Sequence, residues 1–174
     1  MRQVKEHANW HMKARLLKYH EDITPLAREG KGAEFHQLFK PYEVREMEGN
    51  VLLNSGINEI WDLITGVVSG NDHIFDNSYA TIGVGDSATA ADATQTDLQA
   101  AVNKTYKGME SGYPTSTSQK ATFKASFGDS DANYAWNEWV VKQATSGICL
   151  NRKVENLGTK SSGTWTLEVS ITLS

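Results

Sequence analysis

Cysteine and proline are scarce in this sequence, which has one of the first and three of the second among 174 residues. A single thiol excludes a disulfide within the chain and a zinc site built from cysteines. Cys149 stands between Ile148 and Leu150, a setting typical of a buried and unreactive thiol. Few prolines and 14 glycines allow turns without the composition of a disordered chain. We therefore expect one folded domain with a core of its own and no redox chemistry.

Long apolar runs are also missing. No stretch approaches the roughly 20 apolar residues of a membrane-spanning helix. The charged start, Met1 to Glu6, lacks the apolar core of a signal peptide. These absences predict a protein that is made in the cytoplasm and has no membrane partner.

The net charge is only -4, which does not favour a dedicated nucleic-acid binder. The charges are nevertheless unevenly distributed. Residues 1–40 hold eight Lys or Arg and five Asp or Glu, whereas residues 41–174 hold nine and sixteen. A basic segment beside an acidic body indicates docking to another protein.

Residues 1–40 have the features of a basic N-terminal arm, separate from a domain formed by residues 41–174. Residues 1–20 contain no glycine or proline, which favours a helix, but their apolar positions do not form one stripe. Such a helix would pack poorly on its own, so we expect the arm to bind a partner; a helix folded back onto its own domain is the alternative. The residues expected to make this contact are Arg2, Lys5, Trp10, Lys13, Arg15, Lys18, Phe35 and Phe39.

From Tyr42 onward, the pattern is that of short strands. The clearest is 164–173, where Trp165, Leu167 and Val169 alternate with residues such as Thr166 that are expected to face water. No helical pattern separates the strands after residue 84, which excludes parallel crossover units. We predict an antiparallel β-sandwich with jelly-roll-like topology. The expected strands are 42–48, 79–84, 104–109, 120–127, 134–141, 148–154 and 164–173.

One amphipathic helix is predicted within this domain. Asn54 or Ser55 is expected to cap its start, and Gly66 to end it. Its apolar residues follow the i, i+3, i+4, i+7 spacing, which predicts that it closes one end of the sandwich. These residues are Ile57, Ile60, Trp61 and Ile64. The long polar stretch 85–119 is expected to form an excursion with an interface role.

Gly85-Asp86-Ser87 follows a predicted strand and matches the nucleophile block of GDS-type serine hydrolases. Such a serine needs a downstream histidine as its base, and the last histidine here is His73. The same stretch imitates a dinucleotide-binding loop, but no parallel βαβ unit surrounds it. We therefore interpret it as a turn in which Asp86 or Ser87 binds backbone N–H groups, and we expect no enzyme.

Two sets of residues have the chemistry of metal ligands. His7 and His11 are spaced i, i+4, but no third ligand accompanies them. Asp86, Asp92 and Asp97 have the chemistry of a calcium loop without its tight alternation and fixed glycine. We expect no metal and no other cofactor, with calcium as the open alternative.

The densest aromatic cluster is the segment 134–139. Trp136 and Trp139 are an odd number of residues apart, so a regular strand directs one into the core and the other to a neighbouring molecule. Both are therefore candidate interface aromatics. Two tryptophan faces beside Asn137 and Glu138 would also suit a sugar platform, although Glu138 alone does not supply the two carboxylates of a glycosidase.

Six short stretches carry a likeness to known proteins. They are EGNVLLNSG at 48–56, YATIGVGDS at 79–87, QTDLQ at 95–99, ANYAWNEW at 132–139, LNRKV at 150–154 and LGTK at 157–160. In order and wording they resemble a family of virion structural proteins of tailed bacteriophages. The resemblance spans residues 48–174 and implies a particle component without catalytic residues.

Together these observations lead us to expect a capsid decoration, or cement, protein that binds the outer surface of the phage head. Its expected partners are the major capsid protein and neighbouring copies of itself, so it would be a homo-oligomer on a virion assembled in the host cytoplasm. A tail or neck component is one alternative. A carbohydrate-binding module of a receptor-binding tip, resting on Trp136 and Trp139, is the other.

Overall fold

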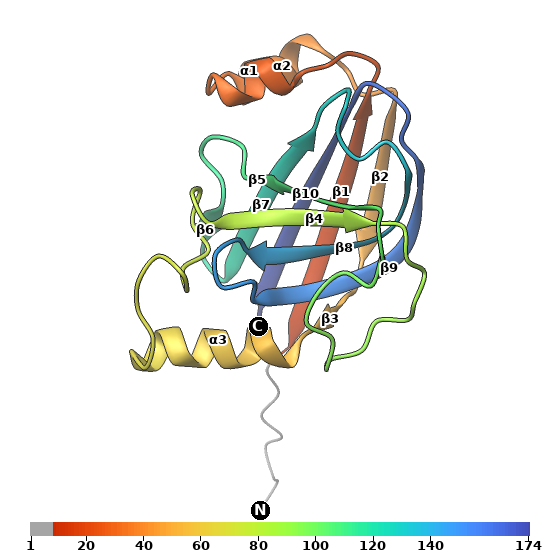
Figure 1. Ribbon diagram of the computed structural model, residues 1–174. Coiled ribbons are helices and arrows are strands. Elements are labelled where there is room, and N and C mark those ends of the chain that lie inside the picture. The colour runs from red at the N-terminus through yellow and green to blue at the C-terminus, as the bar shows by residue number, and fades with distance from the viewer. Residues whose placement is uncertain (1–8) are drawn as a thin grey trace, which may run out of the picture.

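The computed structural model describes residues 9–174, apart from the side chains of residues 27, 28, 33 and 35, and it is a sandwich of two five-stranded antiparallel sheets (Figure 1). This confirms the predicted antiparallel β-sandwich. Sheet A has the order β2 (Glu43–Glu48), β1 (Trp10–Tyr19), β10 (Thr164–Leu173), β7 (Lys120–Phe127) and β6 (Thr115–Thr117). Sheet B has the order β3 (Val51–Leu52), β9 (Cys149–Thr159), β8 (Ala135–Gln143), β4 (Ala80–Gly85) and β5 (Lys104–Gly108).

Strand β1 corrects the prediction for the N-terminal region. Residues 10–19 form no helix and no docking arm, because β1 lies between β2 and β10 and pairs with β10 along its whole length, from Trp10↔Leu173 to Tyr19↔Thr164. Its inward residues Met12, Ala14 and Leu16 are buried at the period of two that a strand requires. Apolar Leu17 and the buried Tyr19 on the opposite face obscured that alternation in the sequence.

The core fills the space between the two inner sheet faces. Trp136 from sheet B packs edge-on against Phe127 and Trp165 from sheet A, with ring centroids 4.8 and 4.9 Å apart. Lys18 closes one end of this cluster, with its Nζ 4.2 Å from the Trp165 ring centroid and 2.9 Å from both carboxylate oxygens of Glu43. The core is therefore built on aromatic contacts between the layers.

The outer face of β10 is less exposed than the alternation predicted. Thr166 was expected to face water but is fully buried, with its Oγ1 2.5 Å from Oγ of Ser126. Two short helices, α1 (Thr24–Arg28) and α2 (Gly32–Leu38), lie at one end of the sandwich (Figure 1). His36 of α2 reaches Lys124 on the outer face of sheet A. A period-two pattern identifies the strand but not what covers its second face.

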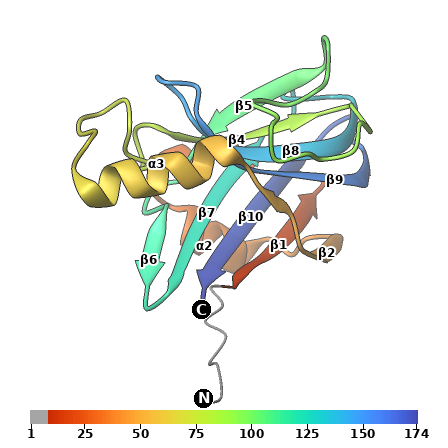
Figure 2. The same ribbon diagram turned by 90° about the horizontal axis from the view of Figure 1, so that it is seen from below.

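Helix α3 (Asn54–Thr65) occupies the opposite end of the sandwich (Figure 2). It ends at Gly66, whose left-handed φ of 71° fits the predicted terminus. The predicted cap is wrong, since Leu53 is the N-cap and makes no side-chain hydrogen bond. Ser55 instead donates its hydroxyl to the carbonyl of Cys149, 3.0 Å away, and so attaches the helix to β9.

The central place of β1 gives a first testable expectation. Deleting residues 1–40 should abolish cooperative unfolding, because β10 would lose one of its two neighbours and Leu16 would no longer cover the core. Urea unfolding followed by tryptophan fluorescence measures this. Deleting only residues 1–8 is the control, since all described strands remain. A cooperative transition in the longer deletion would show that β1 is dispensable.

Candidate functional site

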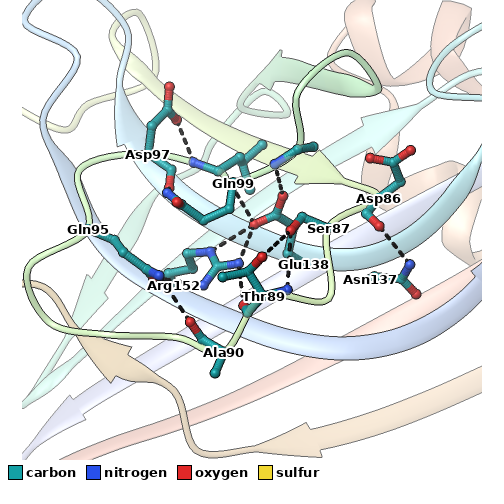
Figure 3. A network of polar contacts seen from close by, with 12 residues as sticks. Asp86, Ser87, Thr89, Ala90, Gln95, Asp97, Gln99, Asn137, Glu138 and Arg152 are labelled. Carbon is teal, nitrogen blue, oxygen red and sulfur yellow. Dashed lines mark hydrogen bonds and ion pairs between the residues drawn. The ribbon is translucent and has the colours of Figure 1, made fainter.

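The most elaborate polar structure of the molecule lies where the loop 86–103 crosses the outer face of sheet B (Figure 3). This loop joins β4 to β5 and contains no helix or strand. Leu98 of the loop is buried and packs with Val140 and Cys149 of the sheet beneath it. The loop therefore has a small apolar base of its own.

An ion pair between Glu138 of β8 and Arg152 of β9 is the centre of this site. The two side chains are fully buried, at 0% exposure each, with Arg152 Nη2 and Nε 2.7 and 2.8 Å from Glu138 Oε2. A charged pair without access to water is stable only when its remaining hydrogen-bonding positions are also satisfied.

Those remaining positions are filled by the loop. Glu138 accepts hydrogen bonds from the backbone N–H groups of Gln99, at 2.9 Å, and Ala100, at 2.7 Å. Arg152 donates to Oε1 of Gln95, at 2.7 Å, and to the carbonyl of Thr89, at 2.9 Å. The pair therefore holds both halves of the loop against the sheet (Figure 3).

A second attachment lies at Asp97. Its carboxylate accepts hydrogen bonds from Tyr106, at 2.5 Å, and from Lys142, at 2.8 Å. Burial tends to raise the pKa of Asp97, but the bonds from these two side chains and from the Leu98 N–H hold it below its usual value. Burial, followed by the charge of Asp97, raises the pKa of Cys149 to about 12, so this thiol stays protonated and unreactive.

The two candidate interface tryptophans are not on the surface. Trp136 and Trp139 are both 0% exposed and both belong to the main core. The pairing of β8 with β9 shifts register between Trp136 and Glu138, so the rule that odd spacings face opposite sides fails here. The same irregularity directs Glu138 outward, beneath the loop. The prediction of an interface role for these tryptophans is therefore wrong.

The other motifs singled out in the loop are parts of local turns. The hydroxyl of Ser87 donates to Thr89 Oγ1, at 3.0 Å, and accepts from the Thr89 N–H, at 3.2 Å. Asp86 accepts a hydrogen bond from Asn103, and Asp92 accepts two from Thr94. Asp86, Asp92 and Asp97 thus bind separate partners. Among the described residues, no three His, Cys, Asp or Glu side chains come together as a metal site would need.

The residues assigned to the arm are dispersed. Trp10 donates a hydrogen bond to Asn50, and Phe39 packs on Tyr19 and Ile23. The three described cations each meet carboxylates: Lys13 pairs with Glu48, Arg15 lies between Glu46 and Glu168, and the buried Lys18 pairs with the partly exposed Glu43. Arg2, Lys5 and His7 lie outside the described residues, as does the side chain of Phe35. His11 is exposed on β1. No common docking surface unites the described members of this set.

Sequence reasoning missed a second polar cluster, beneath α2. Glu110 accepts a hydrogen bond from Ser126 and lies 3.3 Å from Lys124 Nζ and 3.7 Å from Nε2 of His36. Burial tends to raise the pKa of Glu110, but the bond from His36, the charge of Lys124 and the Ser126 hydroxyl hold it below its ordinary value of 4.5. A cavity of about 470 Å³, lined in part by Glu110 and Ser126, adjoins the cluster. These residues come from separate segments of the sequence and meet only in the folded structure.

In chemical terms, the Glu138–Arg152 cluster is enclosed, whereas the Glu110 cluster borders a cavity. Both carboxylate oxygens of Glu138 accept hydrogen bonds from protein donors and the side chain is fully buried, so it is poorly placed to take a proton from a substrate. None of the described helices has the length and apolar character to cross a membrane. No family model, curated protein or solved structure matches the chain. The geometry of the Glu138–Arg152 site is that of a clamp that fixes a long loop.

The clamp gives a second testable expectation. Glu138→Gln should lower the free energy of unfolding by about 3–5 kcal/mol, because it leaves the buried Arg152 charge without a counter-charge. Glu48→Gln is the matched control, since Glu48 pairs with Lys13 in an exposed position and its loss should cost about 0–1 kcal/mol. Urea unfolding gives both values, and amide exchange in residues 86–103 should quicken only in the first variant. Equal costs would refute the clamp.

The Glu110 cluster beneath α2 gives a third testable expectation, which concerns the pH dependence of stability. The folded-state pKa of Glu110 is lower than its unfolded value, so its stabilisation is complete above pH 4.5 and is lost as pH falls through the lower folded value. The unfolding free energy of Glu110→Gln should therefore fall less steeply than that of the unaltered protein below about pH 4.5. Urea unfolding between pH 3 and pH 7 measures both free energies. If they changed with pH at the same rate in the two proteins, an ion-paired Glu110 would be contradicted.

Proposed function

We propose that this protein is a structural component of a tailed-phage virion, and specifically a capsid decoration protein that binds the outer surface of the head. The observation that carries the proposal is the clamped loop 86–103 on sheet B. A loop without regular structure normally loses conformational entropy when it binds. Here the Glu138–Arg152 pair has already fixed it, which supports a role as a preorganised docking surface.

The outer side of the loop is suited to close contact with another protein. Its exposed residues include small side chains such as Ala88 and Ala90, together with Val102, which is 85% exposed. Small side chains allow the backbone of a partner to approach closely, and an exposed valine adds apolar area at the contact. The proposed partners are the major capsid protein and neighbouring copies of this chain, with no role for nucleic acid or membrane.

The resemblance of residues 48–174 to virion structural proteins supports the same function, since it includes the loop and both members of the clamp. A non-enzymatic role is part of the proposal, because the motif at Ser87 has the bonding of a turn. The carbohydrate-binding alternative depended on surface positions for Trp136 and Trp139. Their complete burial removes that support.

The proposal can be tested on purified particles of the phage that encodes the chain. Quantitative mass spectrometry should find it in hundreds of copies, and heads stripped of it should rebind the purified protein and regain heat resistance. Absence from particles would refute the proposal, and a few copies confined to the tail would favour a tail or neck component.

The docking loop itself can be tested by charge insertion. Val102→Asp should weaken rebinding to stripped heads by at least about tenfold, because it places an unpaired charge in the contact. The matched control is Leu38→Asp on α2, where Leu38 is 74% exposed and lies away from the loop. Both variants should unfold at the same temperature as the unaltered protein. Equal binding by the two variants would exclude the loop as the contact surface.

A further inference from the structure

The cavity beside Glu110 is formed by parts of the chain that are far apart in sequence. It has a volume of about 470 Å³, which is within the range of small-molecule sites. Its described walls come from Thr24 of α1, Asn77, residues 107–111 and Ser126 of β7. Most of these residues have polar side chains, and none of them belongs to the clamped loop 86–103. The fold therefore gathers hydrogen-bonding groups around one space that the clamp does not use.

A buried carboxylate, that of Glu110, lines this cavity. Its side chain is 5% exposed, and it accepts a hydrogen bond from the Ser126 hydroxyl. Its Oε2 lies 3.3 Å from Lys124 Nζ and 3.7 Å from His36 Nε2. A carboxylate offers about four acceptor positions, so these contacts leave room for a further donor. Because the pKa of Glu110 is held below its ordinary value, the group is ionised at neutral pH.

The charged groups at the cavity do not balance. Three carboxylates line it or contact a residue that does: Asp22, Glu110 and Asp131. Two ammonium groups do the same: Lys107 and Lys124. His36 adds a positive charge only when it is protonated. Among the described side chains, the cavity therefore has one negative charge in excess, which a cationic ligand would neutralise.

The uncharged groups on the walls include hydrogen-bond acceptors without a donor. Asn77 donates from Nδ2 to the carbonyl oxygens of Glu110, at 2.8 Å, and Tyr113, at 2.6 Å. Because both partners are acceptors, the amide nitrogen faces them, and Oδ1 has no donor among the described residues. Thr24 donates its hydroxyl to Asp22, so its oxygen can only accept from a ligand. A ligand with several N–H donors would satisfy these oxygens.

We propose that this cavity binds an organic cation whose primary ammonium or guanidinium group lies against Glu110. Such a group supplies both the missing positive charge and several N–H donors. The rest of the cavity, which includes Met109, would hold the carbon chain of the ligand. A free amine and a basic side chain of another protein share this chemistry. The site does not depend on the proposed role in the virion.

Titration of the isotope-labelled full chain, followed by NMR, tests the site. The chlorides of n-butylguanidinium and n-butylammonium should shift the amide signals of residues 107–111 and the Nδ2 signals of Asn77, with saturation in the millimolar range. n-Butanol has the same carbon chain without the charge, and sodium chloride matches the ionic strength, so neither should shift these signals. Shifts that do not saturate, or equal shifts with n-butanol, would overturn the proposal.

The source of the cation is decided by a second ligand. A capped Gly-Arg-Gly peptide carries the guanidinium group on a protein backbone. Saturable binding of this peptide would identify a basic side chain of a partner protein as the ligand. Binding of n-butylguanidinium without binding of the peptide would identify a free organic cation.

Removal of the buried charge tests the role of Glu110. Glu110→Gln keeps the size of the side chain and should weaken n-butylguanidinium binding by at least about tenfold, because the charge-assisted hydrogen bond is lost. Glu48→Gln makes the same change in net charge at an exposed position and should leave binding unchanged. Equal affinities of the two variants would refute the assignment of Glu110.

A variant at an exposed residue separates loss of binding from loss of folding. Ser111→Arg places the chain's own guanidinium group at the cavity, and Ser111 is exposed. The melting temperature should therefore stay the same while n-butylguanidinium binding is lost. Ser69→Arg, at an exposed serine outside the cavity, is the matched control and should bind like the unaltered protein. Undiminished binding by Ser111→Arg would overturn the proposal even if Glu110→Gln failed to fold.

Discussion

The pairing of β1 with β10 is the contact on which the rest of the structure depends. It joins residues 10–19 to residues 164–173 in one uninterrupted antiparallel register. This register places Leu16 beside Leu167 and Lys18 beside Trp165, so the centre of sheet A and the aromatic core form together. Within the described residues, no other strand pairing joins β2 and β1 to β10, β7 and β6 in sheet A. A segment with the composition of a basic arm is therefore the structural middle of the domain.

Sheet B is organised by a polar contact. Glu138 and Arg152 face outward from adjacent strands, where an uncovered pair would contribute little in water. The loop 86–103 removes that water and supplies the missing hydrogen bonds through the backbone of Gln99, Ala100 and Thr89. Loop and ion pair thus depend on each other: each would be unfavourable without the other. This mutual dependence attaches a long irregular loop to sheet B at both of its halves.

Local sequence patterns predicted where strands and helices lie better than they predicted what packs against them. The period of two gave 120–127 and 164–173 with correct bounds, and Gly66 marked the end of α3. The misplacements have physical causes. Leu17 and Tyr19 made β1 apolar on both faces because α1 and α2 cover it. A register shift after Trp136 let both tryptophans of β8 face the core, where one had been expected to face outward. Covering elements and register shifts are long-range properties. The Glu138–Arg152 clamp, formed across 14 positions of sequence, was invisible for the same reason.

The central place of β1 also affects how the chain emerges during synthesis. Among the described strands, β1 leaves the ribosome first, but β10, one of its two neighbours, is made last. Until then, Met12 and Leu16 have no completed core to enter. The nascent chain therefore carries an unsatisfied apolar strand until residues 164–173 have been made, a condition that favours misassembly and chaperone binding. Slow, high-contact-order folding that begins only once the distant strand is available is the expected kinetic signature.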